Sequence, residues 1–167
     1  MLLELSTIMD RPGQSVPFET SFDFRDMTFG GNQPVTEAVL AKGRVRNTAG
    51  VLELTAELFT TLHCVCDRCT EPFTREVRFE VHAVLTQSPN EDDFENPWVF
   101  ELKDGHADLD EIFTTAFVLN MDSKFICRED CKGFCFKCGA NLNKAPCTCK
   151  KEIDPRLAVL QQLLTKQ

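Results

Sequence analysis

The nine cysteines are the residues whose type and spacing could do chemistry in this chain. They fall into two groups along the sequence: Cys64, Cys66 and Cys69, then Cys127, Cys131, Cys135, Cys138, Cys147 and Cys149. An odd number of thiols cannot pair completely within one chain, and clustered thiols in a reducing compartment favour metal over disulfide chemistry. The start of the sequence lacks the basic and apolar segments of a secretory signal, so we expect a cytoplasmic protein.

A zinc site is the chemistry that the second group of cysteines predicts. Zinc takes four tetrahedral ligands and favours thiolates. Cys135 and Cys138 form a C-x-x-C pair, and the next residue, Gly139, can adopt the positive φ that such a knuckle requires. Either neighbouring pair, or one thiol from each, could complete the set. We therefore expect one zinc ion, with six candidate ligands: Cys127, Cys131, Cys135, Cys138, Cys147 and Cys149.

The first group offers a competing arrangement. Cys66 and Cys69 are also spaced C-x-x-C and could join Cys135 and Cys138 in a four-cysteine site, although nearer pairs cost less loop closure. Cys64 shares the alternation of the apolar strand residues before it, which favours a core position, and Cys66 shares that parity. A thioredoxin-like role for this pair would need a helix after it, where a strand is expected.

Two enzymatic interpretations of the cysteines are weak. Cys131, Cys135 and Cys138 match the C-x3-C-x2-C spacing of a radical-SAM iron–sulfur site, but the triplet lies too late in a short chain for the barrel that this chemistry needs. The second interpretation is a catalytic zinc, but zinc with four thiolate ligands is usually structural. The chain also lacks a P-loop, a dinucleotide-binding glycine motif and a Gly-x-Ser-x-Gly sequence. We expect a non-enzymatic protein without a small-molecule substrate or a membrane span.

The charge is distributed unevenly. The formal net charge is −8, yet residues 122–151 carry seven Lys or Arg against three Asp or Glu. Lys132 and Lys137 in this segment, and Arg44 and Arg46 on an expected strand, are candidate RNA contacts. The alternative is that the lysines only keep a small metal module in solution.

Hydrophobic periodicity predicts an α+β fold. Alternation indicates strands near residues 41–46, 52–62 and 73–85, and a shorter one at 98–102. Residues 2–8 also read as a strand. Asp108 has the character of a helix cap, and an apolar face follows it at Leu109, Ile112, Phe113, Ala116 and Phe117.

These elements predict an antiparallel sheet that curves toward a barrel, with two helices and a small C-terminal zinc-binding module. The second helix is expected after Asp154-Pro155, with an apolar stripe at Leu157, Leu160 and Leu164. The expected domains are residues 1–121, a β domain with a closing helix, and residues 122–167, the cysteine-rich module and last helix.

Three sequence blocks resemble the YceD family, the large ribosomal RNA subunit accumulation proteins. Residues 66–73, Cys-Asp-Arg-Cys-Thr-Glu-Pro-Phe, are similar to the family's Cys-x-Arg-Cys-x-x-Pro-Phe element. Residues 127–143 resemble the cysteine block of its metal-type members, and residues 154–160 resemble its closing helix. By this resemblance Cys66, Arg68 and Cys69 represent the first family motif.

The resemblance implies a bacterial or organellar factor needed for normal levels of large-subunit ribosomal RNA, with no catalytic activity. Its partner would be precursor ribosomal RNA or a large-subunit assembly protein. The alternative is a protein-only adaptor that docks a basic ribosomal protein through the acidic stretch from Glu91 to Glu95.

Overall fold

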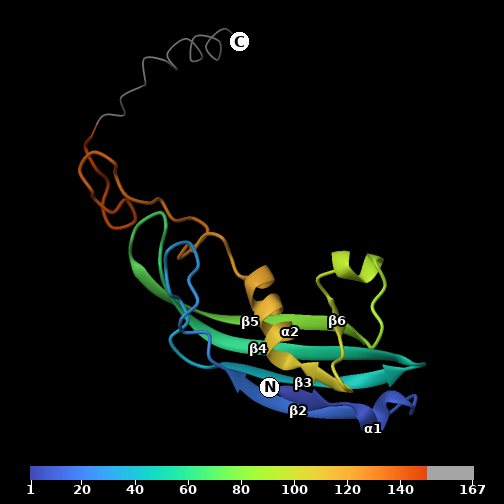
Figure 1. Cartoon of the computed structure of the whole chain (residues 1–167). Helices are drawn as coiled ribbons and strands as arrows, with labels where there is room; N and C mark the ends of the chain where they lie inside the picture. Colours follow the sequence, from blue (N-terminus) through green and yellow to red (C-terminus); the bar gives the residue numbers. More distant parts are fainter. Residues whose placement is uncertain (150–167) are drawn as a thin grey trace. The chain divides into compact units, whose positions relative to one another are not determined.

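The computed structural model describes residues 1–149, which form two compact units. The first unit contains Met1–Val65 and Pro72–Phe125, and the second contains Cys66–Glu71 and the segment that begins at Ile126. The predicted domain boundary near residue 121 stays a prediction, and so does the last helix, which lies outside the described residues. Figure 1 labels most of the helices and strands. Their bounds are β1 (Leu2–Glu4), α1 (Ser6–Met9), β2 (Ser15–Phe22), β3 (Val39–Thr48), β4 (Val51–Val65), β5 (Pro72–Thr86), the 3-10 helix η1 (Asp92–Glu95), β6 (Val99–Glu101), β7 (His106–Asp108) and α2 (Leu109–Asn120).

A five-stranded sheet in the order β2-β3-β4-β5-β6 forms the first unit. Strands β2 to β5 are antiparallel neighbours, and β1 pairs separately with β7. Alternation in the sequence predicts β3, β4 and β5, whereas β2 is not among the predicted strands. The α+β class with a mainly antiparallel sheet is confirmed. The expected barrel-like sheet is not closed: it ends at β2 and at β6, a three-residue strand that runs parallel to β5.

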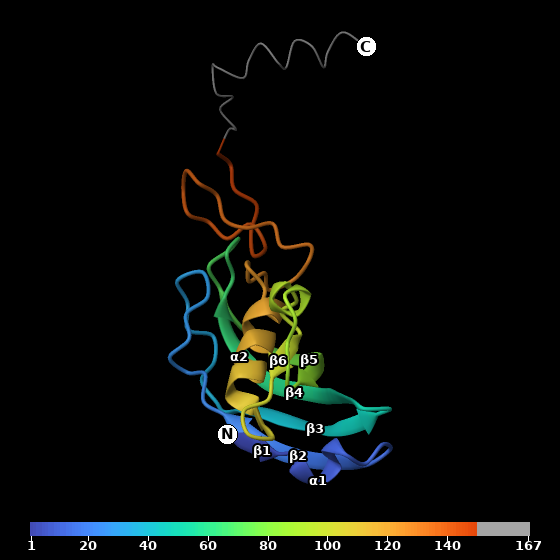
Figure 2. The same ribbon diagram turned by 45° about the vertical axis from the view of Figure 1, so that its right-hand side comes forward.

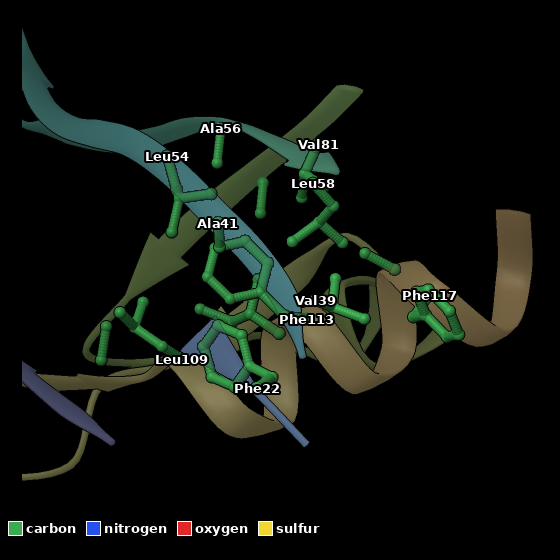
Figure 3. Close-up of a cluster of buried hydrophobic side chains, with 14 of the residues drawn as sticks. Phe22, Val39, Ala41, Leu54, Ala56, Leu58, Val81, Leu109, Phe113 and Phe117 are labelled. Atoms are coloured by element: carbon green, nitrogen blue, oxygen red, sulfur yellow. The ribbon is translucent and has the colours of Figure 1, made fainter. Parts of the chain in front are cut away.

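Helix α2 covers one face of the sheet, as both ribbon views show (Figures 1 and 2). Its side chains Phe113 and Phe117 are fully buried and meet the rings of β2, β5 and the segment after β2. The centroids of Phe22 and Phe113 lie 5.1 Å apart, within the range of favourable aromatic contacts. Figure 3 shows this cluster between the helix and the sheet. The predicted apolar face of the helix is therefore confirmed.

One local feature differs from its prediction. Residues 2–8 are not one strand: β1 ends at Glu4 and the short helix α1 follows. Asn47, a fully buried residue of β3, stabilises this helix: its side-chain amide donates to the carbonyl oxygens of Ile8 and Met9, at 2.8 and 2.7 Å. These hydrogen bonds join residues 39 and 38 positions apart, so a local sequence pattern cannot reveal them. Within residues 1–149, no helix is long and apolar enough to cross a membrane.

Two candidate metal centres

Eight of the nine cysteines gather into two groups of four in the second unit. In each group all Sγ atoms lie within 4.8 Å of one another. The ninth, Cys64, is 3% exposed and lies in the apolar core of the first unit, as expected. We name the groups by their members: centre 1 is Cys66, Cys69, Cys127 and Cys131, and centre 2 is Cys135, Cys138, Cys147 and Cys149.

The sulfur spacing in centre 1 fits one tetrahedral ion. The Sγ atoms of Cys66 and Cys131 are 3.9 Å apart, and those of Cys69 and Cys127 are 3.8 Å apart. A zinc ion with bonds of about 2.3 Å to sulfur sets the edge of its ligand tetrahedron at about 3.8 Å. A disulfide requires about 2.05 Å. This spacing suits ligands of one metal ion, and none of the eight cysteines, all of them described, forms a disulfide.

Each centre contains a C-x-x-C knuckle with the same backbone hydrogen bonds. In centre 1 the Cys66 N–H donates to the Glu71 carbonyl and the Thr70 N–H donates to the Cys66 carbonyl, at 2.9 and 2.8 Å. In centre 2 the corresponding bonds run from Cys135 to the Ala140 carbonyl and from Gly139 to the Cys135 carbonyl, both 2.8 Å. The residue after each knuckle has a positive φ: 59° at Thr70 and 70° at Gly139.

The knuckles favour thiolates at their first cysteines. Burial opposes ionisation of the Cys66 thiol, but backbone N–H groups of Cys127, Cys69 and Arg68 outweigh it and lower its pKa to about 6. At Cys135 the N–H groups of Cys138 and Lys137 lower the pKa to about 6. Hydrogen bonding to the charged form is the physical cause in both knuckles.

One further thiol in each centre, Cys127 and Cys149, resists ionisation in the absence of a cation. Burial, followed by the neighbouring sulfurs of Cys66 and Cys131, raises the pKa of Cys127 to about 12. The Cys138 sulfur and burial raise the pKa of Cys149 to about 12. Four clustered sulfurs cannot all become thiolates without a compensating positive charge. A divalent ion that binds sulfur supplies this charge and displaces the protons.

Arg68 holds the segments of centre 1 together. Its Nη1 donates to the carbonyl oxygens of Glu129 and Cys131, both at 3.3 Å, and its own carbonyl accepts the N–H of Phe134 at 3.0 Å. Gly133 lies so close that an added Cβ would be 2.8 Å from the Arg68 carbonyl oxygen. The arginine of the C-x-R-C motif therefore has a structural role in this chain.

A polar network that sequence reasoning missed supports both centres. Glu71 accepts from Lys144 Nζ at 2.7 Å and from Asn141 Nδ2 at 3.1 Å. Asn143 donates from Nδ2 to the Cys131 sulfur at 3.4 Å and accepts the backbone N–H of Lys132 at 2.8 Å. The network ties the loop between Cys138 and Cys147 to centre 1. The sequence signal was the Asn-x-Asn pair inside the cysteine block.

The structure separates several groupings that the sequence left open. Cys66 and Cys69 lie with Cys127 and Cys131, not with Cys135 and Cys138, so the competing four-cysteine arrangement is wrong. The radical-SAM triplet is divided between the two centres. The expectation of one ion gives way to two candidate sites. The number of clustered cysteines was the sequence signal for a second site, because eight thiols are enough for two tetrahedral sets of four ligands.

The four candidate RNA contacts lie in different units. Lys132 and Lys137 are exposed in the second unit, and Arg44 and Arg46 are exposed on the sheet of the first. On the sheet, Arg46 lies directly opposite Glu53 in the β3–β4 register. Carboxylates among the basic residues weaken this face as an anion-binding surface.

The fold and the two centres define an α+β protein with a sheet-and-helix unit and a unit built on two four-cysteine knuckle sites. Residues 54–164 match the family model described as large ribosomal RNA subunit accumulation protein YceD. The chain belongs to this family.

Three curated relatives illustrate the match. A chloroplastic YCED homolog 1 of Zea mays is 29% identical over 150 residues, covering 72% of this chain and 51% of the relative. The Arabidopsis thaliana homolog 1 is 24% identical over 158 residues, covering 78% and 47%. An uncharacterized protein of Mycobacterium tuberculosis is 32% identical over 105 residues, covering 59% and 49%. The chain thus spans about half the length of the relatives it matches, and no solved structure matches it.

Proposed function

We propose that this chain is a non-enzymatic factor that supports the accumulation of large-subunit ribosomal RNA in a bacterial cytoplasm. The matched family and the chloroplastic relatives are named for that role. The observation that carries the non-enzymatic part is the ligand set: each centre offers four cysteine sulfurs. A tetrahedral ion with four protein thiolates has no position left for substrate or activated water.

Zinc is the ion that we propose for both centres. Sets of four thiolates suit either zinc or iron–sulfur chemistry. The sulfur separations of 3.8 and 3.9 Å in centre 1 support a single ion, because a multi-iron cluster holds its cysteine sulfurs farther apart. The zinc ions would fix the backbone of the second unit and so hold its exposed side chains in place.

Precursor ribosomal RNA is the partner that we favour. The segment from residue 132 to residue 149 contains Lys132, Lys137 and Lys144 and no carboxylate, which supports contact with phosphates. The adaptor alternative has less support, since in the acidic stretch the Asp93 carboxylate already accepts the Asn90 N–H at 2.9 Å.

Deletion and complementation in the source cell test the function. Loss of the gene should lower large-subunit ribosomal RNA relative to small-subunit RNA, measured by quantitative electrophoresis. The wild-type gene should restore the ratio, whereas Cys131→Ser and Cys138→Ser should not. An unchanged ratio after deletion contradicts the proposed role. If Glu91→Lys with Glu95→Lys abolishes complementation while Lys132→Glu with Lys137→Glu does not, the adaptor function replaces RNA binding.

A further inference from the structure

Phe136 is an aromatic side chain that the folded unit leaves in solvent. It is 93% exposed, and the next most exposed large apolar residue among the described side chains, Leu2, is 62% exposed. Single exposed apolar side chains are common on protein surfaces. The exposure becomes informative because of how the backbone holds this ring and what surrounds it.

Phe136 lies in a hydrogen-bonded turn of centre 2. The residue lies between Cys135 and Cys138, inside a turn closed by the two 2.8 Å hydrogen bonds described above. The ring is therefore presented by a hydrogen-bonded turn. The equivalent position in the first knuckle is Asp67, and the following residue there, Arg68, folds back onto the carbonyls of Glu129 and Cys131. The two knuckles therefore share a backbone geometry but expose different side chains, Asp67 in the first and Phe136 in the second.

A groove of about 1030 Å³ extends along this side of centre 2. This volume slightly exceeds the range of about 300–1,000 Å³ that is usual for ligand sites. Phe134 lies in the groove with its ring centroid 5.1 Å from that of Phe136, at an interplanar angle of 57°. Its lining combines these aromatic rings with aliphatic and cationic side chains: Phe134, Phe136, Leu142, Lys132, Lys137 and Lys144.

The charge around the groove favours an anionic partner of modest affinity. Its three lysines contribute +3, and a zinc ion with four thiolates contributes −2, which leaves about +1. Lys144 is also paired with Glu71 at 2.7 Å. Phosphate contacts alone would therefore be weak, and a large part of the binding free energy has to come from the aromatic rings.

We propose that this groove binds a single-stranded stretch of RNA, with one unpaired base stacked on Phe136 and neighbouring phosphates beside Lys132 and Lys137. The inference rests on the proposed function and specifies the form of RNA that the chain recognises. Stacking on aromatic side chains is the usual recognition mode for unpaired bases, whereas bases inside a duplex have no free face to offer. A protein partner is less favoured because lysines border the rings.

Binding of a fluorescent, unstructured RNA octamer to the full zinc-loaded chain tests the proposal. Phe136→Ala should weaken binding by roughly 5- to 150-fold, the cost of one lost base stack. Phe136→Trp should bind at least as well as the wild type. Leu119→Ala is the matched control, because Leu119 is exposed but belongs to α2 in the other unit, and it should bind normally. Metal analysis should show an unchanged zinc content in every variant.

Salt dependence separates stacking from charge. Phe136→Ala should leave the slope of log affinity against log salt unchanged, and Lys132→Gln with Lys137→Gln should flatten it, since only phosphate contacts release counterions. An RNA duplex of the same sequence should bind more weakly than the single strand.

Three results would overturn the proposal: no binding of the octamer by the wild type, equal binding by Phe136→Ala, or equal binding of the duplex. Loss of a protein partner in Phe136→Ala with intact RNA binding would also overturn it and assign the groove to a protein. Failure of the proposed function is recognised separately, because it requires that deletion of the gene leave ribosomal RNA levels unchanged.

Discussion

At the scale of single residues, two glycines of the second unit differ in how much space surrounds them. Gly133 and Gly139 both have positive φ values, 74° and 70°. They differ in space: a Cβ at Gly139 would meet nothing within 4 Å, whereas one at Gly133 would lie 2.8 Å from the Arg68 carbonyl oxygen. Backbone conformation is therefore the constraint at Gly139, whereas at Gly133 close packing against Arg68 adds to it.

This difference predicts unequal costs for the same substitution. Gly139→Ala should weaken zinc binding at centre 2 by about 1–2 kcal/mol, the strain of a left-handed alanine. Gly133→Ala should weaken binding at centre 1 by about 2–5 kcal/mol, because overpacking against the backbone adds about 1–3 kcal/mol. Competition with a zinc chelator measures both affinities. Equal losses in the two variants would contradict the close approach of Gly133 to Arg68.

At the scale of secondary-structure elements, the long strands and α2 could be predicted because their patterns are local. Strands β3, β4 and β5 alternate buried and exposed residues, and Asp108 caps α2 by accepting the Asp110 N–H at 3.0 Å. The parallel pairing of β6 could not be predicted. It depends on contacts such as the 2.9 Å bond from the Val84 N–H to the Trp98 carbonyl, between residues that no periodic pattern connects.

The same distinction applies to the candidate site. The knuckle at Cys135 and Cys138 follows from two cysteines and a glycine that are adjacent in sequence. The partnership of Cys66 with Cys131 joins residues 65 positions apart, so only the folded chain reveals it. Sequence spacing therefore predicted a thiolate site but assigned its ligands to the nearest neighbours.

The short helix α1 is held by a side chain that is distant in the sequence, that of Asn47 on β3. Its amide donates to the two α1 carbonyls, and its Oδ1 accepts the Gly50 N–H at 2.8 Å in the β3–β4 turn. Asn47→Ala should lower the free energy of unfolding of the first unit by about 2–4 kcal/mol, because buried polar groups lose their partners. Chemical denaturation measures this change, with Thr48→Ala, an exposed neighbour on β3, as the control. A loss as small as that of the control would contradict the structural role of Asn47.

At the scale of the whole molecule, the two units are stabilised by different means. The first unit has an apolar core of aromatic and aliphatic side chains. In the described part of the second unit, the buried apolar residues are Cys66, Cys69 and Cys131. Units that lack an apolar core depend on metal binding or disulfides for their stability. Because the cysteines of the second unit form no disulfide, we expect metal removal to unfold this unit and leave the first one folded.

The number of bound zinc ions is the direct test of the two-centre site. Native mass spectrometry of the full chain, purified without added metal, should show two zinc ions per chain. Cys131→Ser and Cys138→Ser should each retain one, and Cys64→Ala, which changes the ninth cysteine, should retain both. A wild-type chain with one zinc ion, with none, or with iron in place of zinc would contradict two structural zinc centres.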